Sequence, residues 1–479
     1  MIHLSLLVLA MFASPGDPVS AADIVAALES ATIDAIAKAQ PSVVAIARVR
    51  GDDPEKTLAV RGESPAAIAP LGPDNKPQRF QYAAPSDFSS GVAIGTNGEI
   101  LTTYHTLRGA AQIWVRTADK QEFEAEILAA DPRSDLAVIA PRGQNAGRGP
   151  KLVPMKLGDA TKMRPGTFLI ALGNPYNAAR DGKASAGWGI LANTARRIHA
   201  PTGDMIGVGI RAQFFRYQPT LLQLDAKLNV GMSGGAVVNM RGELVGLTTA
   251  AASPVAYDVN AGYAIPMDAL GRRIAETLRQ GKEVEYGFLG IGLKEDVPNG
   301  VSNVGPGTPA ESAGLVVNDV IVGVGDRAVD GEDGLTMALA LVPIGGDVKL
   351  KVRRDDRIEE LTVFVSKYPV NGQVIATNRP KPWRGLRVDY SSVIKNTGGF
   401  DFNLMNAMAQ AGVGVVEVET GGAADTAGLR KEQIITEVDG QPVPTPAAFA
   451  KAVAGKEGKA VTLTVGSSLE GKRTVVVGK

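Results

Sequence analysis

The segment NVGMSGGAVVN, residues 229–239, holds a single serine, Ser233, inside a run of small residues. Its letters GMSGG match the pattern G-x-S-x-G, in which a tight turn presents a serine hydroxyl to a substrate. A serine hydroxyl is a weak nucleophile, so acyl transfer needs an adjacent base, usually histidine, and a third group that orients the base. By itself the pattern favours a flexible turn between two strands, and the rest of the chain has to supply those partners.

Three histidines are available as the base: His3, His105 and His199. His3 lies in the apolar N-terminal segment, and His199 lies in a polar stretch beside arginines, where a solvated role is the simplest interpretation. His105 follows the strand-like run EILTTY, where a side chain can be held firmly. An isolated histidine in such a place is more often a hydrogen-bonded core residue. The serine turn is the reason to consider His105 as a catalytic base.

The chain order of the candidate residues excludes one fold. In α/β-hydrolases the histidine follows the serine, and no histidine follows Ser233. The chymotrypsin-like order of His, Asp and Ser requires an aspartate between the other two residues. Asp135, directly before an apolar run, is the first candidate for the orienting acid, and Asp225 is the alternative. Asp131 precedes a proline and is interpreted as a turn residue.

Composition narrows the functional classes. The 479 residues include 50 Lys+Arg and 50 Asp+Glu, and a net charge of zero argues against a nucleic-acid partner. The absence of cysteine excludes disulfides, thiol catalysis and cysteine-ligated metals. The acidic stretch DGEDG at 330–334 lacks the spacing of a calcium loop and is interpreted as a turn. No P-loop occurs either, so we expect no metal and no cofactor.

The N-terminal segment reads as a secretory signal peptide. The apolar run from Leu4 to Phe12 is too short to span a bilayer, and Val19-Ser20-Ala21 fits a small-x-small cleavage pattern. No Lys or Arg precedes the run, and a disordered start is the alternative. We predict that residues 1–22 are removed and that the protein is periplasmic or otherwise extracytoplasmic.

Hydrophobic periodicity indicates the elements that must position the candidate side chains. Helical spacing covers residues 23–40 and again 267–281, and the Pro- and Gly-rich stretch 51–87 is expected to be a long loop. Between residues 89 and 266, short apolar runs such as GVAIG, LAVIA and AVVNM alternate with turn residues. Many short strands at this spacing predict an all-β barrel or sandwich.

The C-terminal part of the chain contains a repeat. Residues 305–329 align without gaps on 419–443, with 8 of 25 positions identical. Each copy has the pattern of a short helix, a glycine stop and a strand with a turn. Two copies predict two similar small domains, because a solenoid would need more repeats. We expect a linker between them at 369–382.

Taken together, these motifs resemble the HtrA/Deg (DegP-like) family of serine proteases. GEILTTYHTL, DPRSDLAVI, ALGNPY, LLQLDAKLNVGMSGGAVVN, GELVGLTTA and AGYAIP occur in the family's order, and the two repeats resemble PDZ domains. The resemblance implies a mainly β fold with a chymotrypsin-like double β-barrel protease domain at 23–282. Two small α/β PDZ domains would follow at 283–368 and 383–479.

The resemblance also implies site roles, position by position. His105 resembles the general base, Asp135 the residue that orients it, and Ser233 the nucleophile. The backbone amides of Gly231 and Ser233, with Met232 as a further donor, resemble an oxyanion hole. The family usually has Asn where Met232 stands, but a backbone amide does not depend on the side chain.

Two further residues resemble determinants of substrate specificity, Lys227 and Tyr263. The family usually carries a small residue at the position of Lys227. A lysine there would favour acidic or polar substrate side chains, or simply extend to solvent. We therefore question the family's usual preference for small aliphatic residues at the cleavage site.

Each PDZ copy has a segment that resembles a carboxylate-binding loop, which captures a peptide C-terminus with backbone amides. An ordinary β-turn without a ligand is the alternative in both copies, and the second match is the poorer because Arg384 replaces an apolar residue. The loop residues are Phe288, Leu289, Gly290 and Ile291 in the first copy and Trp383, Arg384, Gly385 and Leu386 in the second.

The function that the resemblance implies is that of an ATP-independent serine endopeptidase which degrades unfolded or damaged proteins. Its PDZ domains would bind the C-termini of substrates or activating peptides, and family members are commonly trimer-based homo-oligomers. The alternative is a non-catalytic PDZ chaperone or binding protein derived from such a protease. The substitutions near His105 and Ser233 motivate that alternative.

Overall fold

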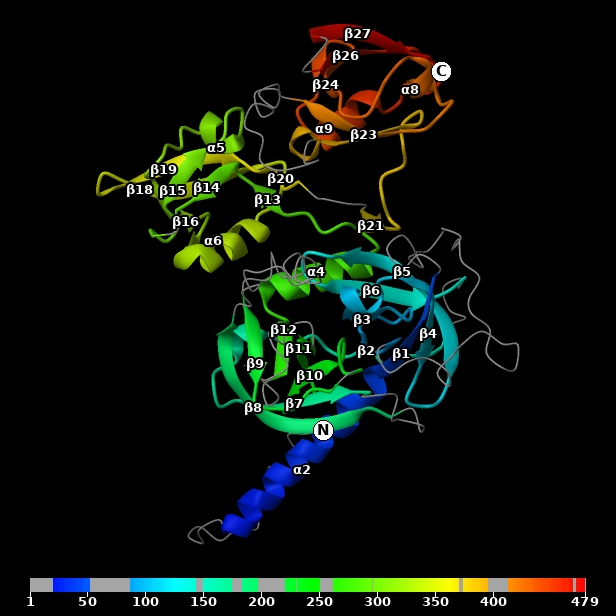
Figure 1. Ribbon diagram of the computed structural model, residues 1–479, viewed down its shortest axis with the longest axis vertical. Coiled ribbons are helices and arrows are strands. Elements are labelled where there is room, and N and C mark those ends of the chain that lie inside the picture. The colour runs from blue at the N-terminus through cyan, green and yellow to red at the C-terminus, as the bar shows by residue number, and fades with distance from the viewer. Residues whose placement is uncertain are drawn as a thin grey trace.

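The computed structural model arranges the chain as a pair of β-barrels and two smaller domains, PDZ1 and PDZ2, which lie on one side of the barrels (Figure 1). The predicted signal peptide up to residue 19, nearly all of the predicted loop 51–87, and His199 lie outside the residues that the structure describes. The described residues are 20–51, 87–143, 150–174, 183–196, 220–229, 231–249, 262–294, 296–369, 374–394, 412–467 and 471–478.

Helix α2 (Ala21–Ala39) leads into the first barrel and begins two residues earlier than predicted. Ser20 and Asp23 form a capping box that satisfies backbone N–H groups of the first turn. Near the C-terminal end, Ala35 and Ala39 are buried, whereas the first turns of the helix are exposed. In Figure 1 the helix extends away from the barrels on the side opposite to the PDZ domains.

The first barrel consists of six antiparallel strands in the order β5-β4-β1-β2-β3-β6, and pairing of β5 with β6 closes it. The closed barrel surrounds a core of aliphatic side chains such as Ile46, Ile113 and Ile139. The strands are β1 (Val43–Arg50), β2 (Phe88–Ala93), β3 (Ile100–Thr103), β4 (Ala110–Arg116), β5 (Glu122–Asp131) and β6 (Leu136–Pro141).

The second barrel is closed in the order β10-β11-β12-β9-β8-β7. Helix α4 (Ala269–Arg279) follows it, as the sequence predicted, and is capped by Asp268, which accepts a hydrogen bond from Gly271 N at 2.9 Å. The helix buries Leu270 and Ile274 in an apolar cluster shared by both barrels. The strands are β7 (Phe168–Gly173), β8 (Ser185–Arg196), β9 (Leu221–Leu224), β10 (Ala236–Asn239), β11 (Leu244–Thr248) and β12 (Gly262–Pro266).

PDZ1 combines three small antiparallel sheets with two helices. The predicted turn at 330–334 is wrong, because Asp330 is an N-cap and helix α6 begins at Gly331. The elements are β13 (Gly287–Phe288), β14 (Ile291–Leu293), β15 (Val301–Val304), α5 (Pro309–Ser312), β16 (Val320–Val324), β17 (Arg327–Ala328), α6 (Gly331–Ala340), β18 (Asp347–Arg354), β19 (Arg357–Phe364) and β20 (Ser366–Lys367).

PDZ2 forms one sheet around its own apolar core. Its helix α8 stands at the position that the sequence repeat assigns to α5 of PDZ1. The elements are β22 (Leu386–Tyr390), β23 (Val413–Val418), α8 (Ala423–Thr426), β24 (Ile434–Val438), β25 (Gln441–Pro442), α9 (Pro446–Val453), β26 (Val461–Ser467) and β27 (Gly471–Val477).

The segment 369–382, which the sequence suggested as a linker, is not a simple tether in its described part. It contains strand β21 (Ile375–Ala376), which pairs with β5 of the first barrel through Ile375 and Ala130. Ile375 is 9% exposed, so burial of an apolar side chain accompanies the pairing. Within the described residues, no helix is long and apolar enough to cross a membrane.

Candidate active site

Asp135 ends the tight connection between β5 and β6. Its φ of 57° is left-handed, a conformation that aspartate tolerates better than most residues. The carboxylate is fully buried, and each oxygen has a partner on residue 105: Oδ1 accepts from the backbone N–H at 2.8 Å, and Oδ2 lies 2.7 Å from the ring Nδ1. Two contacts to one residue fix both the position and the rotation of the imidazole.

His105 lies in a single turn of 3-10 helix, Tyr104–Thr106, directly after β3. The backbone N–H of Tyr104 donates to Asp135 O at 2.9 Å, so the turn is joined to the aspartate by its main chain as well. The imidazole is 21% exposed, in contrast to the buried carboxylate. With Nδ1 directed at the carboxylate, Nε2 is the ring nitrogen left to exchange a proton with a substrate or a nucleophile.

Ser233 lies on the connection between β9 and β10 and is 6% exposed. Ser90 of β2 fastens this connection: its N–H donates to Ser233 O at 2.8 Å, and its hydroxyl donates to Gly231 O at 2.8 Å. The carbonyl of Ser90 accepts from the Thr102 hydroxyl at 2.7 Å. Because Thr102 stands three residues before His105 on the β3 side, the serine turn is held against the strand that presents the histidine.

Gly234 must be glycine for two separate reasons. Its φ is +82°, and a Cβ atom there would lie 2.2 Å from Ser90 O and 2.4 Å from the Thr102 hydroxyl oxygen. On the other side its N–H donates to Thr248 O at 2.8 Å. The close approach of the serine turn to β2 and β3 therefore depends on a missing side chain.

The predicted oxyanion donors differ in their surroundings. Gly231 has a φ of +92°, which allows the sharp turn before the serine. The N–H of Met232 donates to Asn229 O at 3.1 Å, and its carbonyl accepts from Gly235 N at 2.9 Å. The Met232 amide is thus used inside the turn, so we keep Gly231 and Ser233, and not Met232, as candidate donors.

The remaining candidates of the second barrel also have clear positions. Asp225 is exposed, whereas Asp135 contacts the imidazole directly, so the geometry favours Asp135 over Asp225 as the orienting acid. Lys227 is exposed on the stretch that follows β9. Tyr263 is 9% exposed in β12 and stands opposite Gln223 of β9.

The two PDZ loops share a left-handed glycine but differ at their second residue, since Arg384 has a φ of 52° and Leu289 has no positive φ. In PDZ1, Phe288 and Leu289 are buried, and Gly290 has a φ of +83°. In PDZ2, Gly385 has a φ of +77°, but the guanidinium of Arg384 turns back onto the main chain of its own domain. Its acceptors are Val477 O at 2.9 Å, Lys456 O at 2.7 Å, Lys459 O at 2.5 Å and Gly478 O.

Sequence reasoning missed the residues that support the site. Nothing in the run FSSGVA marked Ser90 as the fastener of the serine turn. Asp131 was interpreted as a turn residue, which is wrong: it ends β5, is 2% exposed, and accepts from Arg133 Nε at 2.8 Å. The described residues contain no group of three or more His, Asp or Glu side chains that could hold a metal.

Comparison with known proteins agrees with this architecture. Residues 89–247, which include all three candidate triad residues, match the family model of the trypsin-like peptidase domain. Residues 287–365 and 414–465 each match a model of the PDZ domain. The second PDZ match begins after the 383–386 loop, whereas the first includes the 288–291 loop.

Two curated relatives cover most of the chain. A protein of Chlamydia trachomatis called probable periplasmic serine endoprotease DegP-like is 28% identical over 409 residues, or 82% of this chain and 75% of the relative. The periplasmic serine endoprotease DegP of Escherichia coli is 28% identical over 382 residues, or 77% of this chain and 72% of the relative.

A solved structure, the HtrA-type protease AlgW with tripeptide, is similar in fold. It has a TM-score of 0.51 and 23% identity, covering 71% of this chain and 98% of that chain. Fold, domain content and relatives therefore agree. This chain is a serine endopeptidase with a trypsin-like peptidase domain followed by two PDZ domains, and it is similar to DegP over most of its length.

Proposed function

We propose that Ser233, His105 and Asp135 form a catalytic triad that hydrolyses peptide bonds through an acyl-enzyme. The observation that carries the proposal is the 2.7 Å contact between His105 Nδ1 and a fully buried Asp135 carboxylate. Ser90 and Thr102 fasten the turn of Ser233 beside the same strand. The order and residue types are those of a chymotrypsin-like triad.

In the proposed reaction, Ser233 Oγ attacks the carbonyl carbon of the substrate and gives its proton to His105 Nε2. Backbone N–H groups of Gly231 and Ser233 stabilise the developing oxyanion, and one such donor contributes about 3 kcal/mol. His105 then passes the proton to the leaving amine, and a water molecule releases the acyl group by the reverse path. Asp135 keeps the Nδ1–H tautomer and stabilises the imidazolium that forms.

The substrates we propose are unfolded or damaged proteins outside the cytoplasm. The two relatives are named periplasmic serine endoproteases, which supports an extracytoplasmic location. The PDZ matches support binding of peptide or protein segments, and PDZ domains generally capture an extended peptide C-terminus beside a sheet edge. We further propose that the protein works as a trimer-based homo-oligomer without ATP or another cofactor.

The decisive experiment compares Ser233→Ala with the wild type on casein, which is unfolded, and on a folded protein. Wild type should cleave casein in preference, and the variant should lose activity by roughly 10⁶-fold, to below detection. Ser302→Ala, at an exposed serine of PDZ1, is the matched control and should behave as wild type. A serine-reactive fluorophosphonate should label the wild type and Ser302→Ala only. A folded wild type that neither cleaves nor takes the label would support the non-catalytic PDZ binding protein instead.

A further inference from the structure

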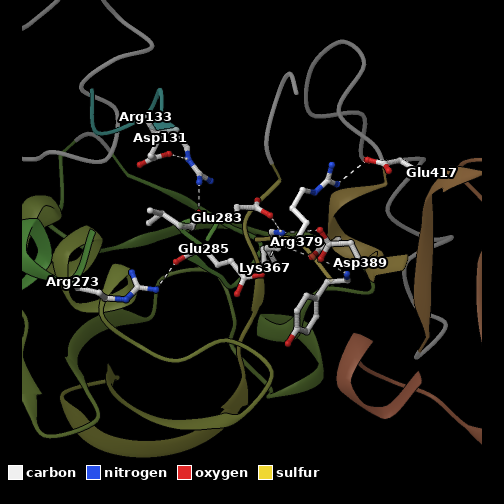
Figure 2. A network of polar contacts seen from close by, with 12 residues as sticks. Asp131, Arg133, Arg273, Glu283, Glu285, Lys367, Arg379, Asp389 and Glu417 are labelled. Carbon is white, nitrogen blue, oxygen red and sulfur yellow. Dashed lines mark hydrogen bonds and ion pairs between the residues drawn. The ribbon is translucent and has the colours of Figure 1, made fainter. Parts of the chain in front are cut away.

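Three polar side chains outside the proposed triad form a buried cluster between the first barrel and PDZ1. Asp131 Oδ2 accepts from the Tyr286 hydroxyl at 2.5 Å, and its Oδ1 accepts from Arg133 Nε at 2.8 Å. The guanidinium carbon of Arg133 lies 4.3 Å from the centre of the Tyr286 ring. Asp131 and Tyr286 are 2% and 1% exposed. Figure 2 shows Asp131 and Arg133 at one end of a longer polar network.

Such a cluster is held together by mutual pairing. A buried carboxylate without partners costs several kcal/mol, so Asp131 depends on the two donors that it has. Burial and the neighbouring Asp131 carboxylate hold the pKa of Tyr286 well above its usual 10. The phenol therefore stays protonated near neutral pH and donates its hydrogen bond continuously.

The barrel side of the cluster is the turn that carries Asp135. Asp131 pairs with Leu136 across β5 and β6, so the chain between them is a short, closed connection. Ser134 is fully buried within it, and Asp135 has left-handed φ. In so short a connection, a shift of Asp131 or Arg133 must be taken up by the residues just before β6.

The PDZ1 side of the cluster is equally fixed. Arg273 donates to Glu285 O at 2.8 Å, and the Tyr368 N–H donates to Tyr286 O at 2.7 Å. Arg133 also donates to Val284 O. Lys367 pairs with Glu283 at 2.9 Å and with Glu285 at 3.3 Å (Figure 2). Tyr286 thus reaches the barrel from a segment whose neighbouring residues are anchored on both sides.

We propose that Tyr286 of PDZ1 is a positioning residue for Asp135, acting through Asp131 and Arg133. The docked segment 283–286 then supports the acid of the triad from a different domain. This inference rests on the proposed function, since Asp135 matters for turnover only if the triad is catalytic. It predicts that loosening Tyr286 lowers kcat and leaves KM nearly unchanged, because the cluster does not touch the substrate.

The test uses the full-length protein and a short chromogenic peptide that occupies only the active site. Tyr286→Phe removes the hydroxyl and keeps the ring, and kcat should fall roughly 10-fold, as expected when a reacting group is slightly misplaced. Tyr390→Phe is the matched control: this half-buried tyrosine has its hydroxyl against Gly345 of PDZ1 and lies near Glu285 and Lys367, but it makes none of the contacts within the Asp131 cluster, so loss of its hydroxyl should leave kcat unchanged. Arg133→Lys keeps the charge but cannot span from Asp131 to Val284, so it should lower kcat in the same direction.

A second readout does not need turnover. The proton between His105 Nδ1 and Asp135 should give a low-field NMR signal in wild type and in Tyr390→Phe, and a shifted or broadened signal in Tyr286→Phe and Arg133→Lys. If the wild type fails to hydrolyse any peptide, the proposed function is wrong, and this signal still decides the positioning role. Unchanged kcat and an unchanged proton signal in both cluster variants would overturn the inference, as would a change confined to KM.

Discussion

The 288–291 loop of PDZ1 and the 383–386 loop of PDZ2 share a left-handed glycine and differ in the backbone and the side-chain partners of their second residue. Leu289 packs into the apolar core of PDZ1 at 2% exposure. Arg384 stands at the same place in PDZ2 and donates to four carbonyls of its own domain. The second loop residue is thus held by burial in PDZ1 and by charge-assisted hydrogen bonds in PDZ2.

The two loops do share a pattern of backbone hydrogen bonds. In each copy the second loop residue accepts from the short helix that follows, and the glycine accepts from the strand end beside it. These bonds are Ala310 N to Leu289 O at 2.9 Å and Gly305 N to Gly290 O at 2.9 Å in PDZ1, and Ala424 N to Arg384 O at 3.2 Å and Glu419 N to Gly385 O at 2.8 Å in PDZ2.

The difference teaches that this pattern of backbone hydrogen bonds does not require an apolar second residue. It requires that the side chain of the second residue have suitable partners. These are the apolar core in PDZ1 and carbonyl oxygens near the ends of α9 and β27 in PDZ2. We infer that Arg384 is a structural clamp and is not directed at a bound carboxylate.

The largest effect is expected when the PDZ2 residue is placed in PDZ1. Leu289→Arg would bury a guanidinium among aliphatic side chains without carbonyl acceptors, which costs about 4 kcal/mol for an uncompensated charge. Hydrogen exchange of β16 and β18 in the full-length protein should report opening of PDZ1 alone. Val317→Arg, at a residue 49% exposed, is the control and should leave exchange unchanged. Protected strands in Leu289→Arg would mean that PDZ1 can clamp an arginine as PDZ2 does.

The glycines of the two loops should differ in their tolerance of alanine. Both have positive φ, but a Cβ on Gly290 would lie 2.3 Å from Thr308 Cγ2, whereas on Gly385 the nearest atom is 3.2 Å away. Thr308 is 1% exposed and cannot move aside. Gly290→Ala should therefore lower stability by about 3 kcal/mol, and Gly385→Ala by about 1 kcal/mol from backbone strain alone. Thermal unfolding followed by domain-resolved hydrogen exchange measures both, and equal losses would contradict the steric argument.

Removing the clamp should have an intermediate effect. Arg384→Leu restores the apolar pattern of PDZ1 but deletes the donors to four carbonyls, and we expect a loss of about 2 kcal/mol. Trp383 is a convenient probe, because the guanidinium lies 4.8 Å from its ring centre. Arg384→Lys is the matched variant, since it keeps the charge but lacks the forked donors. If Arg384→Leu instead raises stability and PDZ2 gains affinity for free C-terminal peptides, the clamp interpretation is wrong.

The sequence could predict the features that depend on local patterns or on the order of residue types. The contact between His105 and Asp135 could be predicted, with Ser233 as their proposed partner, because the chemistry demands three residue types in one order and few residues of the chain qualify. An all-β barrel or sandwich followed from the spacing of short apolar runs, and the double barrel followed from the family resemblance. The strand signals lie in adjacent residues, and the signal for the active site lies in the order of residue types along the chain.

Other features depend on contacts between distant segments. Asp131 resembles a turn residue until Tyr286, 155 positions away, supplies its hydrogen bond. The stretch 375–376 resembles a linker in the sequence, but in the structure it pairs with β5 as a short strand. Ser90 resembles an ordinary strand serine in the sequence, but in the structure its hydroxyl donates to Gly231 O in the turn of Ser233. No local pattern carries such information, because the partner is chosen by how the domains pack.

The smallest effect should come from the ion pairs that accompany the PDZ2 loop. Glu417 of β23 pairs with Arg387 of β22 and with Arg379, both at 2.8 Å. Burial raises the pKa of Glu417, but the hydrogen bonds from the two arginines outweigh it and hold the pKa below its usual 4.5. A lowered folded-state pKa contributes stability that is present above about pH 4.5 and lost as the pH falls through the folded-state value.

Glu417→Gln tests this contribution with nearly the same side-chain shape. Because the carboxylate is 42% exposed, the pair is screened by water, and the loss at pH 7 should be only a few tenths of a kcal/mol. Melting temperatures of wild type and variant should therefore differ slightly at pH 7 and converge as the pH falls through the lowered folded-state pKa of Glu417, where the carboxylate is protonated and the pair is lost. A difference that persists or grows at low pH would mean that the shape of the β22–β23 contact, and not its charge, stabilises this edge of PDZ2.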